Sequence, residues 1–398
     1  MMRLFHTATD EEIKKGETTD VYFERTLEVL KAEGLDGTNV VAEATVSSIP
    51  EDWSWGILAG VEEAARLMTD CPVDIDILDE GTLFRTRDHR GFKAPIMRLT
   101  GPYGAWCKLD TALLGLFCQA SGIATTAAKV RRAAGNKTVM DFGARRMHPA
   151  ISPMIGRSAY IAGVDAVSSV AAAKLLHVEA MGTMPHALII IFGDQVKAWK
   201  AFDKVVPRNI PRIVLVDTYF DEKTETLMAA EALGDHLSGV RLDTPGSRRG
   251  NFADIVREVR WELDSRGYRD VKIFVSGGLN TDSVRKLSEA GADGFGVGTF
   301  VSNAEVVDFA LDIVEIDGRG VAKRGKLGWS KELWRCPNCL VDITLPKSSP
   351  APNCPQCGGK TEAMLKPLIR NGRLVRELPS PQDLRKNVLA QLEKVALE

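Results

Sequence analysis

Short apolar runs alternate with helical stretches between about residues 126 and 325. The runs are rich in β-branched residues and long enough for buried strands, and the later ones recur at roughly the 20–35 residue spacing of βα units. The runs that we predict to be strands are 138–143, 187–192, 212–217, 239–243, 271–275 and 295–297. Strands that alternate with helices predict a parallel sheet or βα barrel.

The chain on either side of this region has a different pattern. Before residue 126, helical spacing at about 21–30, 58–68 and 113–120 is mixed with a strand at 40–48 and short strands broken by turns from 72 to 108. This mixture predicts a small, sandwich-like α/β domain. After residue 325 come paired cysteines and a tail, 379–398, that ends in an amphipathic helix. We therefore expect three regions: 1–125, 126–325 and 326–398.

Composition narrows the class of protein. The 398 residues carry a formal net charge of −2, so no global basic field favours nucleic acid. The N-terminus is polar from its sixth residue and lacks the apolar core of a signal peptide, and we expect no run of membrane-spanning length. Three cysteines are scattered and four are clustered, which fits a reducing cytoplasm.

The four clustered cysteines form two CxxC pairs, Cys336 with Cys339 and Cys354 with Cys357. Two such pairs put four thiolates at the spacing of a tetrahedral site. We favour structural zinc over a redox pair or an iron–sulfur site. Four cysteines saturate zinc and leave no open position for catalysis.

The stretch 271–299 predicts a phosphate site. Its pattern is strand, glycine turn, helix, strand and second glycine turn, with Asn280 or Thr281 as helix cap. Ser276-Gly277-Gly278 and Gly298-Thr299 follow the two strands and expose backbone N–H groups. The last two such loops of a βα barrel commonly hold a phosphate.

Other polar residues gather at predicted strand ends. Arg145, Arg146 and His148 follow the strand at 138–143, and arginine suits planar anions because its fork makes two parallel hydrogen bonds. Phe142 is available to stack a flat ring. Two further predicted strands end in a carboxylate: 212–217 ends at Asp217, and 239–243 ends at Asp243, within Arg241-Leu-Asp243-Thr244. Thr183 and His186 precede the strand predicted at 187–192. Such a mouth suits a phosphorylated sugar and a small acidic partner.

Seven motifs follow one another along the chain in this order: DVYF, FGARRMHP, GTMPHA, LVDTY, RLDT, SGGL and GVGT. In these motifs the chain resembles the nicotinate phosphoribosyltransferase family, particularly its archaeal branch with a cysteine ribbon. The resemblance covers nearly the whole chain. It implies an α/β fold of the quinolinate/nicotinate phosphoribosyltransferase type: an incomplete βα barrel with an N-terminal α/β domain and a small C-terminal zinc ribbon. It also implies that nicotinate and phosphoribosyl pyrophosphate give nicotinate mononucleotide and pyrophosphate, in NAD salvage.

The resemblance also assigns roles. Phe142 would stack on the pyridine ring, with Tyr22 from a neighbouring subunit on its other face, and Arg145 would pair with the nicotinate carboxylate. A homodimer or higher oligomer with shared active sites follows. His186 matches a histidine that many members phosphorylate with ATP, although ATP use stays open for this branch. The ribose, pyrophosphate and Mg²⁺ would be surrounded by Asp217, Arg241 and Asp243, and the 5′-phosphate by Gly277, Gly278, Gly298 and Thr299.

One position departs from the nicotinate pattern. Asp165 stands where many nicotinate enzymes have a neutral residue, and in the related nicotinamide enzyme an aspartate there contacts the amide. An unpaired Asp165 carboxylate would repel nicotinate, so it must be turned away, paired or protonated, or the substrate is not nicotinate. Two alternatives stand on other grounds: quinolinate phosphoribosyltransferase, which has the same fold but also decarboxylates, and, because of the cysteine ribbon, a zinc-ribbon module that binds RNA or protein.

Overall fold

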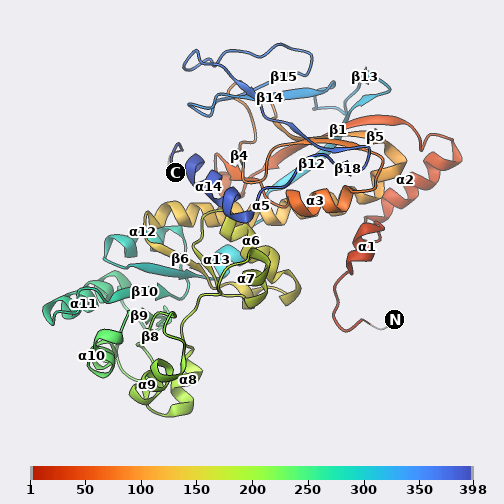
Figure 1. Ribbon diagram of the computed structural model, residues 1–398. Helices are drawn as coiled ribbons and strands as arrows, with labels where there is room; N and C mark the ends of the chain where they lie inside the picture. The colour runs from red at the N-terminus through yellow and green to blue at the C-terminus, as the bar shows by residue number, and fades with distance from the viewer. Residues whose placement is uncertain (1–2, 396–398) are drawn as a thin grey trace. The chain divides into compact units, whose positions relative to one another are not determined.

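The computed structural model describes residues 3–395 (Figure 1). The first two residues of the polar N-terminus and the last three of the predicted tail lie outside this range. The chain divides into two compact units. One unit is Thr126–Ala304, and the other combines the residues up to Thr125 with those from Glu305 onward.

The unit Thr126–Ala304 contains a parallel sheet of six strands in the order β7-β6-β11-β10-β9-β8. Within the described residues the two outer strands, β7 and β8, do not pair with each other, so the sheet forms an open half-barrel. The predicted parallel βα architecture is confirmed. The strands are β6 (Thr138–Asp141), β7 (Ala166–Val167), β8 (Ile213–Leu215), β9 (Gly239–Leu242), β10 (Lys272–Ser276) and β11 (Gly294–Val297).

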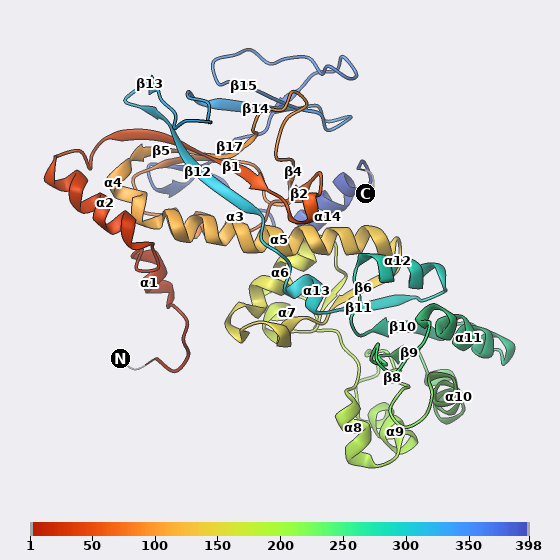
Figure 2. The same cartoon turned by 180° about the vertical axis from the view of Figure 1, so that it is seen from behind.

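Helices follow the strands of the half-barrel, as Figures 1 and 2 show from opposite sides. Asn280 caps α12 through its side chain, and Gly291, with φ 104°, follows the helix end, as the sequence predicts. The helices of this unit are α6 (Ser152–Ile161), α7 (Val170–Leu176), α8 (His186–Phe192), α9 (Gln195–Val205), α10 (Glu222–Leu233), α11 (Phe252–Ser265), α12 (Thr281–Glu289) and α13 (Thr299–Ser302), with 3₁₀ turns η3 (Ala144–Arg146), η4 (Pro149–Ile151) and η5 (Gly234–His236).

The strand predicted at 187–192 is wrong, because these residues form α8. The isoleucine run suggested a buried strand, but Pro185 precedes the helix and Gly193, at φ 66°, ends it. Only Ile189 is buried in α8, and Ile191 is 82% exposed. A strand that the sequence pattern missed, β7, takes the edge position of the sheet; it has only two residues and so no visible period.

The other unit is built on a sheet of seven strands in the order β13-β12-β1-β5-β3-β17-β18, all paired antiparallel. Its strands are β1 (Asn39–Ser48), β3 (Asp74–Ile77), β5 (Pro95–Pro102), β12 (Asp308–Ile316), β13 (Arg319–Gly320), β17 (Lys366–Arg370) and β18 (Arg373–Leu374), and β2 (Gly56–Ile57) pairs with β4 (Leu83–Phe84). The helices are α1 (Asp10–Lys14), α2 (Val21–Ala32), α3 (Val61–Met68), α4 (Tyr103–Trp106), α14 (Pro381–Leu392) and the first part of α5 (Asp110–Ala134), which continues into the other unit from Thr126, with 3₁₀ turns η1 (Pro50–Asp52) and η2 (Cys107–Leu109).

The expected division into three consecutive regions needs correction. Residues from Glu305 onward belong with the N-terminal unit, because β12 pairs along nearly the whole of β1. β17 likewise pairs with β3. The N-terminal strands would otherwise present unpaired edges, which β12 and β17 cover. Periodicity along the chain cannot show this, because strand partners distant in sequence leave no local signal.

One face of this sheet carries the hydrophobic core. Ala42, Ala44 and Val46 of β1 pack in one cluster with Leu113 and Phe117 of α5, which runs beside the sheet in Figure 2. The stretch Tyr103–Ala134 is long and apolar enough to cross a membrane by length and composition, contrary to the expectation that no run would be. Because 61% of its apolar window is buried inside the protein, this helix is part of a core.

The cysteine ribbon is a sheet of three strands, β15 (Asp342–Pro346), β14 (Lys331–Arg335) and β16 (Glu362–Ala363). The tail helix is confirmed as α14, with Leu384, Val388 and Leu392 buried.

Candidate active site and metal centre

A cavity of about 430 Å³ opens at the carboxyl ends of β6, β9, β10 and β11. All of the residues that line it belong to the unit Thr126–Ala304. Most of the polar residues predicted at strand ends therefore meet at one mouth. The predicted residues in its lining are Phe142, Arg145, Arg146, His186, Arg241, Asp243, Ser276, Gly277, Gly278, Gly298 and Thr299.

The two glycine turns form one wall of the cavity. Gly277 and Gly278 have φ 93° and 67°, in the left-handed region that favours glycine. Gly296 serves a different purpose, since a Cβ there would lie 2.3 Å from the ring of Phe142. The turns thus present backbone to the cavity, and Gly296 leaves the aromatic ring its space.

A hydrogen-bonded network links Arg241, Asp243 and Ser276. Arg241 Nη1 donates to Ser276 Oγ at 3.1 Å, and Ser276 Oγ donates to Asp243 Oδ1 at 2.8 Å. Arg241 also donates from Nη2 to the carbonyl of Met184 at 3.0 Å. Burial lowers the pKa of Arg241, whereas the neighbouring Asp243 raises it. The guanidinium is held in one orientation, with its carbon 5.8 Å from the centre of the Phe142 ring.

Asp217 lies behind the cavity and does not line it. Its Oδ1 is 3.0 Å from His186 Nε2, and its Oδ2 accepts from the Asp243 amide at 2.7 Å and from Thr244 Oγ1 at 3.1 Å. The Asp217 side chain is 2% exposed, against 38% for His186. Burial raises the pKa of Asp217, and the Asp243 amide opposes this shift. The carboxylate therefore orients His186 and the loop after β9.

Only some of the site residues predicted in the loop after β6 line the cavity. Phe142, Arg145 and Arg146 line the cavity. His148 does not, and its Nδ1 instead accepts from the Ala150 amide at 3.1 Å, which caps η4. Thr183 also lies outside the lining, and its hydroxyl is 3.4 Å from the carbonyl of Met184.

Asp165 points away from the cavity. Its Oδ2 lies 2.6 Å from Arg131 Nη1 and accepts from the Val139 amide at 2.9 Å. Val139 is near the amino end of β6, whereas the cavity opens at the carboxyl end. Of the possibilities expected for Asp165, a carboxylate that is paired and turned away matches this geometry and a substrate contact does not, because the ion pair with Arg131 holds the carboxylate near the amino end of β6.

Sequence reasoning missed Asp141, the last residue of β6. It is 2% exposed, its Oδ1 accepts from the Gly143 amide at 2.8 Å, and its Oδ2 has no hydrogen-bond partner among the described residues. Burial raises the pKa of this carboxyl to about 6. Asp141 thus anchors the loop that carries Phe142 and Arg145. A carboxylate closing an apolar run was the available signal.

Tyr22 belongs to the other unit. It lies on α2, is 55% exposed and stands at a cavity of about 510 Å³ with Tyr103 and Trp106. Its ring centre is 4.4 Å from that of Phe23. An aromatic side chain on an exposed helix is available to a second molecule.

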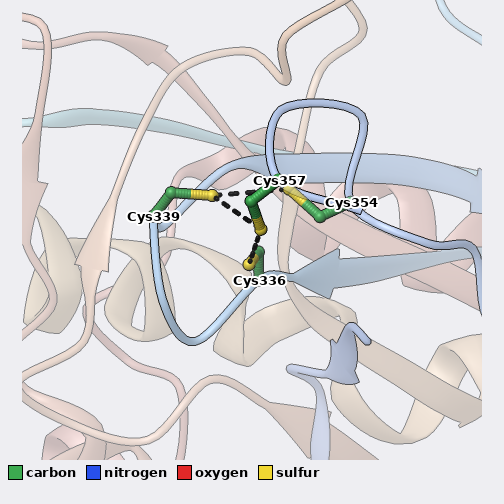
Figure 3. Close-up of side chains that lie close together, drawn as sticks. All are labelled: Cys336, Cys339, Cys354 and Cys357. Atoms are coloured by element: carbon green, nitrogen blue, oxygen red, sulfur yellow. Dashed lines mark hydrogen bonds between the residues drawn. The ribbon is translucent and has the colours of Figure 1, made fainter. Parts of the chain in front are cut away.

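The four clustered cysteines meet in space (Figure 3). Their sulfurs all lie within 4.8 Å of one another, with 3.5 Å between Cys336 and Cys357 and 3.4 Å between Cys339 and Cys354. Four thiolates that each lie about 2.3 Å from one zinc ion have sulfur–sulfur distances of roughly 3.8 Å, whereas the sulfur–sulfur bond of a disulfide is only about 2 Å long. The donor set and spacing fit structural zinc.

Comparisons with known proteins agree along the chain. Residues 123–312 match the family "Quinolinate phosphoribosyl transferase, C-terminal domain", and residues 20–121 match "Quinolinate phosphoribosyl transferase, N-terminal domain". A nicotinate phosphoribosyltransferase of Mycobacterium tuberculosis (strain ATCC 25618 / H37Rv) is 28% identical over 92% of this chain and 88% of its own length.

Two solved structures are similar as well. The nicotinate-nucleotide pyrophosphorylase of Pyrococcus furiosus is 49% identical, with 99% of each chain covered and a TM-score of 0.95. The human nicotinic acid phosphoribosyltransferase is 20% identical, with 95% of this chain and 94% of that chain covered and a TM-score of 0.76, a likeness of fold.

Proposed function

Because this chain belongs to the nicotinate and quinolinate phosphoribosyltransferase family, we propose that it transfers a phosphoribosyl group from phosphoribosyl pyrophosphate to nicotinate. The products are nicotinate mononucleotide and pyrophosphate, in the salvage route to NAD. The observation that carries the proposal is the single cavity lined by arginines, a carboxylate, an aromatic ring and two glycine turns.

The phosphoribosyl donor suits one side of the cavity. Its 5′-phosphate fits the turns at Gly277-Gly278 and Gly298-Thr299, where backbone amides serve as donors. Arg241, fixed by Ser276 and Met184, supplies positive charge for the pyrophosphate. Asp243 stands beside Arg241, close to where positive charge develops on the ribose.

The pyridine suits the other side. Phe142 offers its ring face and Arg145 a planar fork for the carboxylate. Arg131 holds Asp165 near the amino end of β6, at the opposite end of the strand from the cavity. Asp165 therefore does not repel nicotinate from this cavity. The pyridine nitrogen attacks the anomeric carbon as pyrophosphate leaves, and the protein contributes position and electrostatics.

Mg²⁺ would be held by Asp243 together with the pyrophosphate of the donor. The Asp243 side chain is 27% exposed and lines the cavity, whereas the Asp217 carboxylate is committed to His186 and two donors. Mg²⁺ is usually bound by one or two carboxylates plus substrate phosphates. When bound, it neutralises charge on the leaving pyrophosphate. A structural zinc would occupy the four cysteines.

We further propose that His186 couples the transfer to ATP hydrolysis. With its proton on Nε2, toward Asp217, the imidazole keeps a lone pair on Nδ1. Nδ1 would take the γ-phosphoryl group and ADP would leave. We expect His186→Ala to abolish ATP stimulation but to spare slow transfer. An ATP-stimulated His186→Ala enzyme would refute this role.

We also propose a homodimer or higher oligomer that works in the cytoplasm. Tyr22 lies on an exposed helix, where it can reach a second molecule. Ile190, Ile191 and Phe192 of α8 are exposed as well, and a partner would cover them. The three scattered cysteines form no disulfides, which fits a reducing compartment.

Quinolinate remains the second candidate substrate, because Arg145 and Arg146 both line the cavity and could take two carboxylates. The test is a product assay with the ribosyl donor and nicotinate, nicotinamide or quinolinate in parallel, with and without ATP. We expect mononucleotide and pyrophosphate from nicotinate, without carbon dioxide. Carbon dioxide release with quinolinate as the preferred acceptor would favour the alternative. Retention of RNA without pyrophosphate release would favour a binding module.

A further inference from the structure

The N-terminal unit has a second cavity, of about 230 Å³, with charged as well as apolar side chains in its lining. It lies over the face of the seven-stranded sheet opposite the hydrophobic core, because Glu43 and Thr45 line it while Ala42 and Ala44 of the same strand belong to the core. The segments 87–93 and 325–327, together with Lys331 at the start of β14, complete its wall. None of its lining residues belongs to the unit Thr126–Ala304, so this cavity is separate from the barrel mouth.

Positive charge exceeds negative charge in this cavity. Four basic side chains line it against two carboxylates. Lys331 pairs with Glu43 at 2.9 Å, and Lys326 pairs with Asp312 at 2.7 Å. These two pairs account for both carboxylates. The remaining two basic residues, Arg87 and Lys93, decide what the cavity attracts.

Arg87 and Lys93 contact only carbonyl oxygens. Arg87 Nη1 donates to the carbonyl of Gly91 at 2.7 Å, and Lys93 Nζ to that of Val46 at 2.5 Å. Across residues 3–395 neither forms a salt bridge with a carboxylate. Burial lowers the pKa of Lys93, and the charges of Lys326 and Arg87 lower it further, against the smaller opposing effect of Asp308 and Asp312. Cations that crowd one another in a partly buried cavity favour an anion between them.

Thr45 adds an unused hydroxyl. The residue is 6% exposed, lines the cavity, and its Oγ1 has no hydrogen-bond partner among the described residues. A buried hydroxyl without a partner costs stability, of the order of 1–3 kcal/mol. A phosphate oxygen in the cavity would accept this hydrogen bond.

An aromatic cavity adjoins the cationic one. It has a volume of about 410 Å³, shares Phe92, Leu327 and Lys331 with the first cavity, and is lined by Trp329. Trp329 is 57% exposed and has φ 66°, a conformation that is costly for a bulky residue. Gly320 packs against its indole, where a Cβ would come within 2.4 Å. Such strain persists where surrounding structure imposes it and often marks ligand sites.

We propose that the two adjoining cavities bind a nucleotide, with its phosphate between Arg87, Lys93 and Thr45 and its base on Trp329. Each part of the ligand matches one cavity: the smaller, cationic one suits a phosphate group, and the larger, apolar one suits a flat ring. This site does not depend on the proposed phosphoribosyl transfer.

Calorimetric titration of the full-length, zinc-loaded protein with AMP tests the proposal. We expect Arg87→Gln/Lys93→Gln to weaken AMP binding at least about tenfold, and added salt to weaken binding to the wild type. The barrel variant Arg241→Ala should retain this binding, as should Lys200→Gln, a control that changes an exposed lysine on α9. AMP binding by Arg87→Gln/Lys93→Gln that equals wild-type binding overturns the proposal.

Trp329→Gly is a second test variant, because it removes the indole and glycine adopts the φ of 66° without strain. It should weaken AMP binding about fivefold or more, the loss of one stacked base, and leave inorganic phosphate binding unchanged. Inorganic phosphate should bind the wild type more weakly than AMP does. Equal affinity for phosphate and AMP, or an unchanged Trp329→Gly titration, overturns the assignment of a nucleotide. Phosphoribosyl transfer without AMP should be the same in all of these variants except Arg241→Ala.

Discussion

The four-cysteine cluster and the barrel mouth are both small groups of side chains that meet in space, but the chain assembles them differently. The cluster comes from two CxxC turns within 336–357. The mouth draws on the ends of β6, β9, β10 and β11 and on the start of α8. The cluster can be recognised from local spacing alone, whereas the mouth exists only when parallel strands bring their carboxyl ends together. The first is suited to stability and the second to chemistry.

The largest expected effect is on catalysis at the mouth. Arg241→Ala removes a buried guanidinium that contacts Ser276, Asp243 and the Met184 carbonyl. We expect kcat/KM to fall about 10³-fold, since preorganised charge at a developing negative group is worth this much. Steady-state kinetics measure it, with Arg269→Ala, an exposed arginine of the same unit, as control. A fall below tenfold would contradict the role of Arg241.

Changes in the cysteine ribbon should lower the stability of the protein rather than its catalytic rate. Cys354→Ser, or removal of the metal by a chelator, should lower the melting temperature by several degrees or more, because bound structural zinc contributes folding free energy. The kcat of the molecules that stay folded should change less than about twofold. Thermal unfolding with zinc analysis tests this, and Cys118→Ala, outside the cluster, should keep its zinc. Full stability without metal would exclude a structural role for zinc.

Within the mouth, a variant of one residue should weaken the binding of one substrate and leave the binding of the other nearly unchanged. Arg145→Ala should raise the KM for nicotinate about 10²-fold, the loss of a bidentate contact, and leave the KM for the ribosyl donor within a few fold. Initial rates with each substrate varied in turn measure both constants. Equal effects on both would count against Arg145 as the carboxylate partner.

The smallest expected effect is the pH dependence of stability at Asp141. Its pKa rises from 3.8 to about 6 on folding, so the folded protein binds the extra proton between these values and loses stability as pH rises through this window. Asp141→Asn removes this loss. We expect equal stability of the two proteins near pH 4 and an advantage for the variant at pH 8 on the order of 2 kcal/mol. Urea unfolding at both pH values measures the difference, and no gain at pH 8 would contradict it.

Sequence alone predicted the features that short-range geometry determines. The Asn280 cap, the glycine turns at Gly277 and Gly298 and the CxxC spacing depend only on neighbouring residues. Long-range pairing escaped prediction: β12 returns to β1. A paired Asp165 was among the expected possibilities, but the sequence did not identify Arg131 as its partner. The helix α8 was mistaken for a strand because a run of isoleucines is compatible with either. Asp217 proved to lie outside the cavity lining, where it holds His186, which does line the cavity.

The affinity for nicotinate mononucleotide tests the central claim most directly, because this one molecule carries both the 5′-phosphate and the pyridine carboxylate. Arg145→Ala and Gly277→Val change residues that follow two different strands of the mouth, β6 and β10. Each should weaken binding by about tenfold or more in calorimetric titration. The first variant loses the fork that takes the carboxylate, and the second puts a side chain on a left-handed residue and so displaces the turn whose amides take the phosphate. Wild-type affinity in either variant would contradict the account of a single shared site.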